Sequence, residues 1–318
     1  MASSDSSNSS NSSNSSMNSK MSAFGVTHIG GSDNVENQDT FFINTESRVF
    51  GVFDGHGHGG KTVSEIACNI FITETESKKM DTVFTEVDAV LKQTISSDPA
   101  AGGTTASVLR VNENGTCTVY HVGDSEVRMY EKGGETDGVS LVEDHSATSL
   151  PEFMRFRALQ TPIYFEFGGK YDDHRSVFVK GFDGKFKYHP EGGYSYCNVR
   201  NEYQAYIVGP FNERLAMTRA LGDFNMKKIC GVTAEPSIVT FDNVITELHT
   251  IRAFVLASDG LWDGMNYSDI GAILLRPDLI GNAEAAANEL MAVSIATNKR
   301  LFGSSADNVT IVVVYVSI

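Results

Sequence analysis

Four aspartates in this sequence stand where an apolar run meets a glycine or a polar turn. Asp54, Asp124 and Asp259 each follow such a run, and Asp307 precedes one. Short apolar runs bounded by turn residues are typical of buried strands. Because the end of one antiparallel strand and the start of its neighbour share an edge, all four carboxylates can meet on one rim. Carboxylates packed that closely repel one another unless hard cations such as Mg²⁺ or Mn²⁺ lie between them. The sequence therefore predicts a carboxylate metal site, with His56 beside it.

The turn from Asp54 to Gly57 is the strongest local signal for this chemistry. The Asp54 carboxylate has two oxygens to offer to cations, and Gly55 lets the backbone turn so that its carbonyl oxygen can also face one. His56 titrates near neutral pH and can act as a proton donor. Asp-Gly is also a common hairpin turn, so this motif taken singly fits an ordinary turn equally well. The other aspartates taken singly are also compatible with loop ends.

Strand-like and helix-like segments alternate from Met21 onward, and these segments have to position the carboxylates. Apolar runs predict strands at residues 22–29, 40–44, 48–53, 104–111, 116–122, 126–130, 238–241, 252–257 and 309–316. Helical spacing predicts helices at residues 61–77, after 81, and at 149–159, 268–275 and 282–298. The strands at 104–111, 116–122 and 126–130 are expected to form one antiparallel run. This order predicts an α+β fold with stacked antiparallel sheets and helices outside.

Local signals also predict where helices begin and which side chains are buried. Asp81, Ser268 and Asn282 are the predicted N-caps. The helix after Asp81 carries an apolar stripe that we expect to face the core: Val83, Phe84, Val87, Val90, Leu91 and Ile95.

The composition predicts one domain with a tail and an insertion. Residues 1–20 are rich in Ser and Asn and are predicted to be disordered. Residues 21–318 are enough for one sizeable core and are predicted to form a single domain. Residues from about 148 to 215 are the least periodic, and after a short helix we expect an irregular flap insertion there.

Charge and cysteine usage exclude several classes of partner. Acidic residues outnumber basic ones by 40 to 25, which gives a net charge of −15 and disfavours nucleic acid and anionic membranes as partners.

There is no apolar leader and no stretch of about 18 apolar residues, so neither export nor a membrane span is predicted. The cysteines are scattered without a C-x-x-C pair, which predicts reduced thiols in an intracellular protein, cytoplasmic or nuclear. We expect a monomer.

Order and spacing give these motifs a joint meaning, because the chain resembles the protein phosphatase 2C family of metal-dependent Ser/Thr phosphatases. The matching segments follow the order of the family and span nearly the whole chain after Met21: Asn37-Gln38-Asp39, Val52-Phe53-Asp54-Gly55-His56-Gly57, Gly103-Thr104-Thr105-Ala106, Gly123-Asp124-Ser125, Thr218-Arg219-Ala220-Leu221-Gly222-Asp223, Ala257-Ser258-Asp259-Gly260-Leu261-Trp262-Asp263 and Asp307-Asn308-Val309-Thr310.

The resemblance implies two Mg²⁺ or Mn²⁺ ions and a third, looser one. Asp54 would bridge the first two ions, and the carbonyl oxygen of Gly55 would bind one of them. Asp259 and Asp307 would complete the shell of the other ion. Asp124, together with Asp259, matches the position that holds the third ion.

The resemblance also implies the reaction and the fold. Phosphoserine and phosphothreonine in phosphoprotein substrates would be hydrolysed by a metal-activated water, without a phospho-enzyme. His56 matches the general acid, and Asp39 and Gln38 would lie behind the metal ligands, where Asp39 orders metal-bound water. The implied fold is a β-sandwich of two antiparallel sheets flanked by helix pairs, in four layers αββα, with an enlarged flap beside the active site. Residues 21–318 would then form a single phosphatase catalytic domain. The flap either shapes the binding of protein substrates or is a tolerated surface insertion.

Two positions depart from the family pattern. Many members have an arginine that grips the substrate phosphate where this chain has Asn34, which cannot offer a charged bidentate fork. Lys61, His58 or an arginine of the flap are the alternatives for this role. Gln38 stands where a glutamate is common, which removes one negative charge near the metals.

These departures keep two other functions open. The alternative is a catalytically weak pseudophosphatase that acts as a binding or regulatory module, which Asn34 and Gln38 favour and the intact aspartates oppose. A metallohydrolase of small phosphate esters is the third reading, although the sequence has no nucleotide-binding loop to support it.

Overall fold

The computed structural model describes residues 20–74, 79–95, 97–98, 100–161, 163–166, 174–188, 197–210, 213–242 and 251–317. The tail predicted at residues 1–20 lies outside the described residues except for Lys20, which is the first residue of strand β1.

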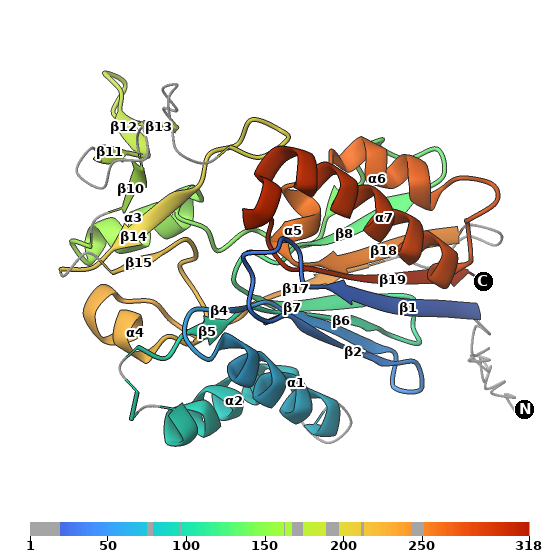
Figure 1. Cartoon of the computed structure of the whole chain (residues 1–318), viewed down its shortest axis with the longest axis horizontal. Coiled ribbons are helices and arrows are strands. Elements are labelled where there is room, and N and C mark those ends of the chain that lie inside the picture. Colours follow the sequence, from blue (N-terminus) through green and yellow to red (C-terminus); the bar gives the residue numbers. More distant parts are fainter. Residues whose placement is uncertain are drawn as a thin grey trace, which may run out of the picture.

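Two five-stranded antiparallel sheets lie at the centre of the molecule (Figure 1). The first has the order β1-β19-β18-β8-β9, with β1 at Lys20–His28, β8 at Val127–Glu131, β9 at Val139–Ser140, β18 at Ile251–Ala257 and β19 at Val309–Ser317. The second has the order β17-β7-β6-β3-β2, with β2 at Thr40–Asn44, β3 at Val49–Phe53, β6 at Ala106–Val111, β7 at Cys117–Val122 and β17 at Ser237–Phe241.

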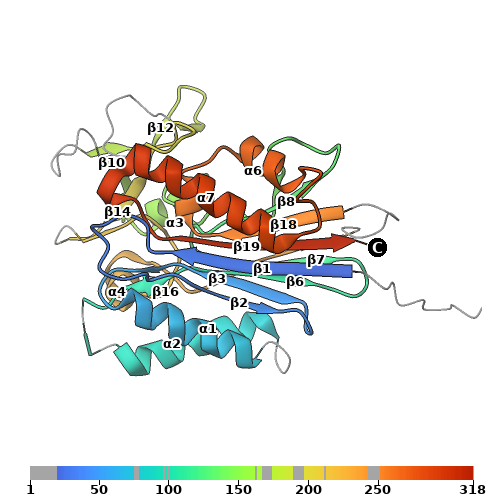
Figure 2. The same cartoon turned by 45° about the vertical axis from the view of Figure 1, so that its right-hand side comes forward.

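A pair of helices covers the outer face of each sheet. Helices α1 (Gly60–Glu74) and α2 (Met80–Ile95) lie on the second sheet, and α6 (Tyr267–Leu274) and α7 (Ala283–Phe302) lie on the first. Figure 2 shows the resulting four layers from helix pair to helix pair. The predicted α+β sandwich, αββα, is confirmed.

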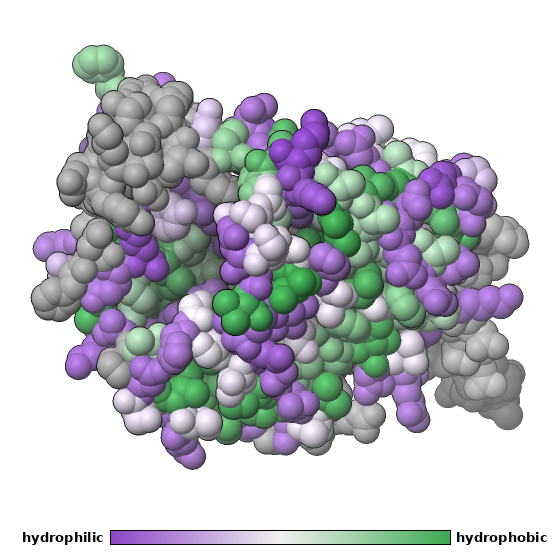
Figure 3. Space-filling model, in the orientation of Figure 1, coloured by the Kyte–Doolittle hydropathy of each residue, from purple (hydrophilic) through white to green (hydrophobic). Residues whose placement is uncertain are grey.

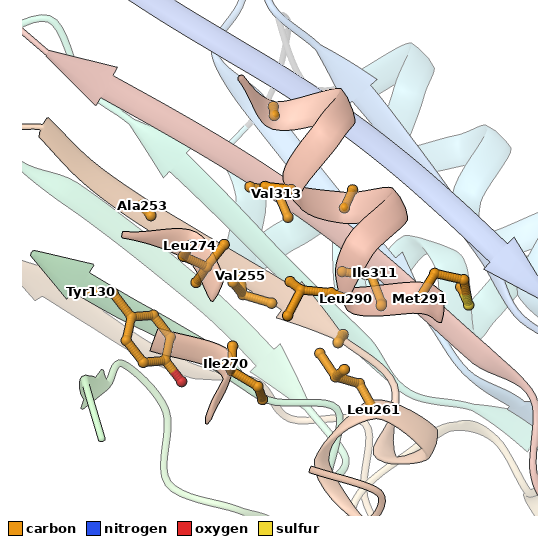
Figure 4. Packing of buried hydrophobic residues seen from close by; sticks show 14 of the residues in the cluster. Tyr130, Ala253, Val255, Leu261, Ile270, Leu274, Leu290, Met291, Ile311 and Val313 are labelled. Atoms are coloured by element: carbon orange, nitrogen blue, oxygen red, sulfur yellow. The ribbon is translucent and has the colours of Figure 1, made fainter. Parts of the chain in front are cut away.

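Three apolar layers hold this sandwich together. Between the sheets, the side chains of Phe50, Leu109 and Phe254 are fully buried. Figure 4 shows the layer between the first sheet and helices α6 and α7, where Leu290 packs over Val255. The layer under α1 and α2 contains a run of contacting rings, because Phe71 lies 5.3 Å from Phe53 and 4.9 Å from Phe84 between ring centroids.

The flap, residues 148–215, lies at one end of the sandwich (Figure 1), and its buried side chains share a small apolar core with residues between 217 and 232. Its described elements are α3 (Leu150–Ala158), β10 (Ile163–Glu166), β11 (His174–Ser176), β12 (Phe178–Lys180), β13 (Phe186–Tyr188), β14 (Ala205–Val208) and β15 (Arg214–Leu215). Short strand pairings replace the irregular chain expected from the sequence, with the order β11-β10-β14-β15 in the larger sheet.

Several short elements at the same end were not predicted. A three-stranded sheet of order β16-β5-β4 joins β4 (Gly55–His56), β5 (Gly103–Thr104) and β16 (Leu221–Gly222). Helices α4 (Phe224–Cys230) and α5 (Asp259–Trp262) and the turn η1 (Gly303–Ser305) complete the chain. Such short elements carry too few residues for an apolar period to reveal them.

The strand predicted at residues 126–130 does not continue the antiparallel run. It forms β8, which pairs with β18 in the opposite sheet. The place beside β7 is taken by β17, from a segment more than 100 residues further along. The strand predicted at 104–111 is also interrupted, because β5 ends at Thr104 and β6 begins at Ala106.

Three local predictions about helices were wrong. Asp81 is not the N-cap of α2, because the helix already begins at Met80. Val90 is 41% exposed, because it lies at the edge of the α2 stripe, whereas Val83, Phe84, Val87 and Leu91 are fully buried. Helix α6 begins earlier than predicted, so that Asn266 rather than Ser268 is its N-cap. The Asn282 N-cap of α7 is confirmed, since its side chain accepts a hydrogen bond from the amide of Ala285 at 3.1 Å.

Within the part of the chain that the structure describes, no helix is both long and apolar enough to cross a membrane. The cysteines at 68, 117, 197 and 230 are all free thiols. The intracellular location and the monomeric state stay predictions.

Replacing Phe254 by Ala should lower the free energy of unfolding by about 3–5 kcal/mol, because the truncation opens a cavity between the two sheets. Val239→Ala on the edge strand β17, where Val239 is 37% exposed, is the control and should cost less than about 1 kcal/mol. Urea unfolding followed by circular dichroism measures both, and equal losses would contradict the placement of Phe254 in the core.

Candidate functional site

The four aspartates singled out by the sequence line one cavity of about 400 Å³ together with His56. Asp54 follows β3 and Asp124 follows β7 in the second sheet, whereas Asp259 follows β18 and Asp307 precedes β19 in the first. The rim expected from strand ends therefore exists, and both sheets contribute to it. Figure 3 shows the surface hollowed on this side, between the flap and the loop that follows β1.

Thr105 fixes the Asp54 turn against the Asp124 turn. Its backbone amide donates to the Asp54 carbonyl oxygen at 2.9 Å, and its hydroxyl oxygen accepts from the Asp54 amide at 3.0 Å. The same hydroxyl lies 2.7 Å from the Ser125 hydroxyl, next to Asp124. Thr105 and Ser125 are fully buried, so these bonds do not compete with bulk water. The break between β5 and β6 at Thr105 is what frees this residue for the role.

Ser258 holds the Asp259 and Asp307 segments together. Its amide donates to the Thr310 carbonyl oxygen at 3.1 Å, and its hydroxyl oxygen accepts from the Thr310 amide at 2.9 Å. The Ser258 hydroxyl in turn donates to Oδ2 of Asp39 at 2.8 Å. Asp39 is 8% exposed and is not among the residues that line the cavity.

Gln38 and Asn308 brace the turns that carry Asp54 and Asp307. The Gln38 side-chain amide donates to the Gly57 carbonyl oxygen at 3.0 Å, and its backbone amide donates to Oδ1 of Asn308 at 2.8 Å. The Asn308 amide donates to Oδ1 of Asp307 at 2.7 Å. A neutral side chain at residue 38 therefore acts as a tether for the Asp54 turn.

Close approach at two glycines makes these contacts possible. A Cβ atom at Gly260 would collide with the carbonyl oxygen of Asn308, so any larger residue would separate the Asp259 and Asp307 segments. A Cβ atom at Gly103 would collide with the carboxylate of Asp223.

Burial and mutual repulsion raise the pKa of the rim carboxyls. The pKa of Asp54 lies well above its ordinary value because of burial and the negative charges of Asp39 and Asp259. Burial also raises the pKa of Asp39 to about 6 and that of Asp124 to about 6. The pKa of Asp259 is raised well above normal by burial and by Asp307. Without a cation these groups resist ionisation, so the site favours a positive ligand.

Buried polar atoms without a partner point in the same direction. Among the described residues, Oδ1 of Asp39 and Oδ1 of Asp259 are shielded from solvent and have no hydrogen-bond donor. A buried acceptor without a donor lowers the stability of the folded protein unless a cation or a water molecule reaches it. Carboxylate oxygens are the ligands that Mg²⁺ and Mn²⁺ prefer, so this donor set fits such ions.

His56 is held by a carboxylate that the sequence motifs contained but that had no assigned role. Its Nε2 atom lies 2.7 Å from Oδ2 of Asp223, because the small sheet brings β4 and β16 to either side of β5. Asp223 has a left-handed backbone with φ of 47°, directly before helix α4. Burial lowers the pKa of His56, but the negative charge of Asp223 and its hydrogen bond outweigh this and the net shift is upward.

A second, smaller cavity of about 110 Å³ lies on the other side of Asp124 and Asp259 and is also lined by Asp263. Sequence reasoning gave Asp263 no role, although it stands only four residues after Asp259 and one turn of α5 brings the two to one side. Trp262 is buried next to the site, since it is 3% exposed and its indole N–H donates to the Ala257 carbonyl oxygen at 2.9 Å.

Asn34 is used for folding and not for the cavity. Its side-chain amide donates to the carbonyl oxygens of Ile29 and Ala306, at 2.7 and 2.9 Å. These bonds fasten the loop after β1 to the segment before β19.

Comparison with known proteins agrees with this arrangement. A sequence model of the family described as "Protein phosphatase 2C" matches residues 10–168 and 198–300. The chain is 26% identical over 289 residues to "Protein phosphatase 1L" of Bos taurus, covering 85% of this chain and 64% of that protein. It is 29% identical over 275 residues to "Probable protein phosphatase 2C 11" of Arabidopsis thaliana, covering 83% and 57%. The match spans less than two thirds of either relative.

Solved structures share the fold at lower sequence identity. The serine-threonine phosphatase 2C from Toxoplasma gondii superposes with a TM-score of 0.62 at 18% identity, over 93% of this chain and 95% of that one. The catalytic domain of the phosphatase PstP, solved in complex with two manganese ions, gives a TM-score of 0.57 at 15% identity, over 94% and 100%. The family match over most of the chain shows that this protein belongs to the protein phosphatase 2C family.

Proposed function

We propose that this protein hydrolyses phosphoserine and phosphothreonine in proteins, with Mg²⁺ or Mn²⁺ as cofactor. The observation that carries the proposal is the shared cavity, in which four aspartates from both sheets face His56. Such a cavity is suited to binding cations and a phosphate group together, and the family match agrees with this reaction.

Asp54, Asp259 and Asp307 are the proposed ligands of two ions, with the Gly55 carbonyl oxygen as a further ligand and Asp124 reserved for a third ion. Within the described ranges no three acidic, imidazole or thiol side chains already enclose a metal position. Water would therefore supply the remaining ligands, as Mg²⁺ commonly requires. When bound, the ions would acidify a water molecule and offset charge on the phosphoryl oxygens.

The residues of the chain would supply orientation and a proton. His56 would protonate the seryl or threonyl oxygen as it leaves, since an alkoxide is a poor leaving group. The carboxylate of Asp223 contacts Nε2 of the imidazole ring. This contact holds the ring in position and favours its protonated form, which is the form that can donate a proton. Asp39, behind the rim, would orient water near the ions, and Gln38 would keep the Asp54 turn in place.

The second candidate is a binding module with little turnover. Asn34 favours it, because its amide is occupied by backbone carbonyl oxygens and provides no charge for a phosphate. The complete set of rim carboxylates favours the enzyme.

A phosphothreonine peptide assay separates the two candidates. The purified chain should release phosphate only with Mn²⁺, and Asp54→Asn should lower the rate by more than about 100-fold, because several kcal/mol of transition-state stabilisation depend on the ions. Release that persists in a chelator, or that is equal in the variant, would exclude the proposed mechanism. A binding module would retain the peptide without release.

Metal should stabilise the protein in a pH-dependent way. Because the folded-state pKa of Asp39 and of Asp124 is raised to about 6, the metal-free protein should lose stability as the pH rises from about 4 to about 6 and stay less stable above it. Mn²⁺ neutralises this repulsion, so its addition should raise the free energy of unfolding more at pH 7.5 than at pH 5, by on the order of 1–3 kcal/mol. The measurement is the rise in melting temperature on adding Mn²⁺ at each pH. If Mn²⁺ raised the melting temperature of Asp54→Asn as much as that of the wild type, the result would argue against a metal site at Asp54.

The contact between Asp223 and His56 should matter only for poor leaving groups. Asp223→Asn should lower kcat on a phosphothreonine peptide by about 10–100-fold, because the acid is no longer held in position. On p-nitrophenyl phosphate the same variant should lose little, since p-nitrophenolate leaves without a proton. His56→Gln is the matched control and should show the same pattern. Equal losses on both substrates would contradict the role of Asp223 in holding the acid.

A further inference from the structure

The charges around the cavity are unevenly distributed. Among the described residues that line it, six side chains are acidic and one is a permanent cation, Arg214 of strand β15. A phosphate monoester carries two negative charges and enters this cavity only against the field of the carboxylates. Divalent ions would offset the aspartates that bind them, but a further cation is needed to attract the outer phosphoryl oxygens.

We propose that Arg214 binds the phosphoryl group of the substrate and that the flap thus supplies the cation that the loop after β1 lacks. This inference rests on the proposed phosphatase function and adds to it a substrate-binding residue. Guanidinium is suited to the task because its planar fork can donate two parallel hydrogen bonds to phosphate oxygens.

The pairing of β15 with β14 explains why the side chain reaches the cavity. Leu215 lies opposite Ile207 and both are buried in the flap core, at 8% and 0% exposure. Successive side chains on a strand point to opposite faces, so Arg214 extends from the face away from that core. Arg214 is half-buried. A guanidinium in this environment acts more strongly on a phosphate than one in bulk water does.

The other cations considered from the sequence do not line this cavity. His58 is 75% exposed and its Nε2 atom lies 3.5 Å from a carboxylate oxygen of Asp98. Lys61 is exposed on the first turn of α1. Neither belongs to the cavity lining, which includes Gly57 of the same turn but neither of these side chains.

Arg200, another flap arginine, is committed to structure. It lines the smaller cavity and pairs with Glu202 at 2.6 Å. Its guanidinium also donates to the Trp262 carbonyl oxygen and lies 4.3 Å from the ring centroid of Tyr267. Arg200 therefore docks the flap onto α5 and α6 and lines the smaller cavity, whereas Arg214 lines the larger one.

The test compares Arg214→Gln and Arg214→Lys with Arg157→Gln. Arg157 is an exposed flap arginine stacked on Phe186, at 4.7 Å from its ring centroid, and does not line the cavity. The readouts are kcat and KM for p-nitrophenyl phosphate with Mn²⁺, the inhibition constant of inorganic phosphate, and the melting temperature.

Loss of a charge-assisted contact should raise the inhibition constant of phosphate and lower kcat/KM by about 10–100-fold in Arg214→Gln. Arg214→Lys, which keeps the charge but not the fork, should fall between this variant and the wild type. Arg157→Gln should stay within about twofold, as expected for an exposed charge. Unchanged phosphate inhibition in Arg214→Gln at an unchanged melting temperature would overturn the proposal.

Phosphate binding measured by calorimetry in the presence of Mn²⁺ separates this proposal from the proposed function. The wild type could show no turnover and yet bind phosphate more tightly than Arg214→Gln does. This result would contradict the proposed phosphatase activity and support the role of Arg214 in phosphate binding. Turnover that is intact in the wild type and equal in both Arg214 variants would support the enzyme and contradict Arg214. If Arg214→Gln is unstable, the comparison of Arg214→Lys with Arg157→Gln decides.

Discussion

Mutual repulsion among buried carboxylates is the constraint on which the rest of this structure depends. Six acidic side chains line one cavity, and four of them are the rim aspartates. Burial strengthens the repulsion between the negative charges of these aspartates. A chain free to relax would move them apart. The two stacked sheets prevent this, because the rim residues stand at the ends of strands whose other residues are locked into three apolar layers.

Neutral side chains connect the rim to those strands. The Thr105 hydroxyl and the Gln38 side-chain amide bond to the backbone of the Asp54 turn, and the Ser258 hydroxyl bonds to the carboxylate of Asp39. The side-chain oxygen of Asn308, next to Asp307, accepts from the Gln38 backbone amide. Since these groups carry no charge, they hold the acidic turns without neutralising them. The carboxylates remain available to cations, at a cost in stability that cation binding would offset.

The sandwich and the flap contribute different groups to the cavity. The sandwich supplies the anionic rim, and the flap brings Arg214 together with the acidic Glu213 on and beside the short strand β15. A separate contact set, centred on Arg200, fastens the flap to α5 and α6. Docking and proposed substrate binding therefore use different arginines, so each can be altered without the other.

The sequence alone determined where the long helices and strands lie and which aspartates form the rim of the cavity. Apolar runs and turn residues located Asp54, Asp124, Asp259 and Asp307, because strand burial and turn chemistry are local properties. Only the tertiary structure decided which strands are neighbours, so that β8 joined the opposite sheet, and which side chains meet across the site, such as Asp223 with His56. These pairings depend on packing between segments far apart in the chain, and no local pattern records them.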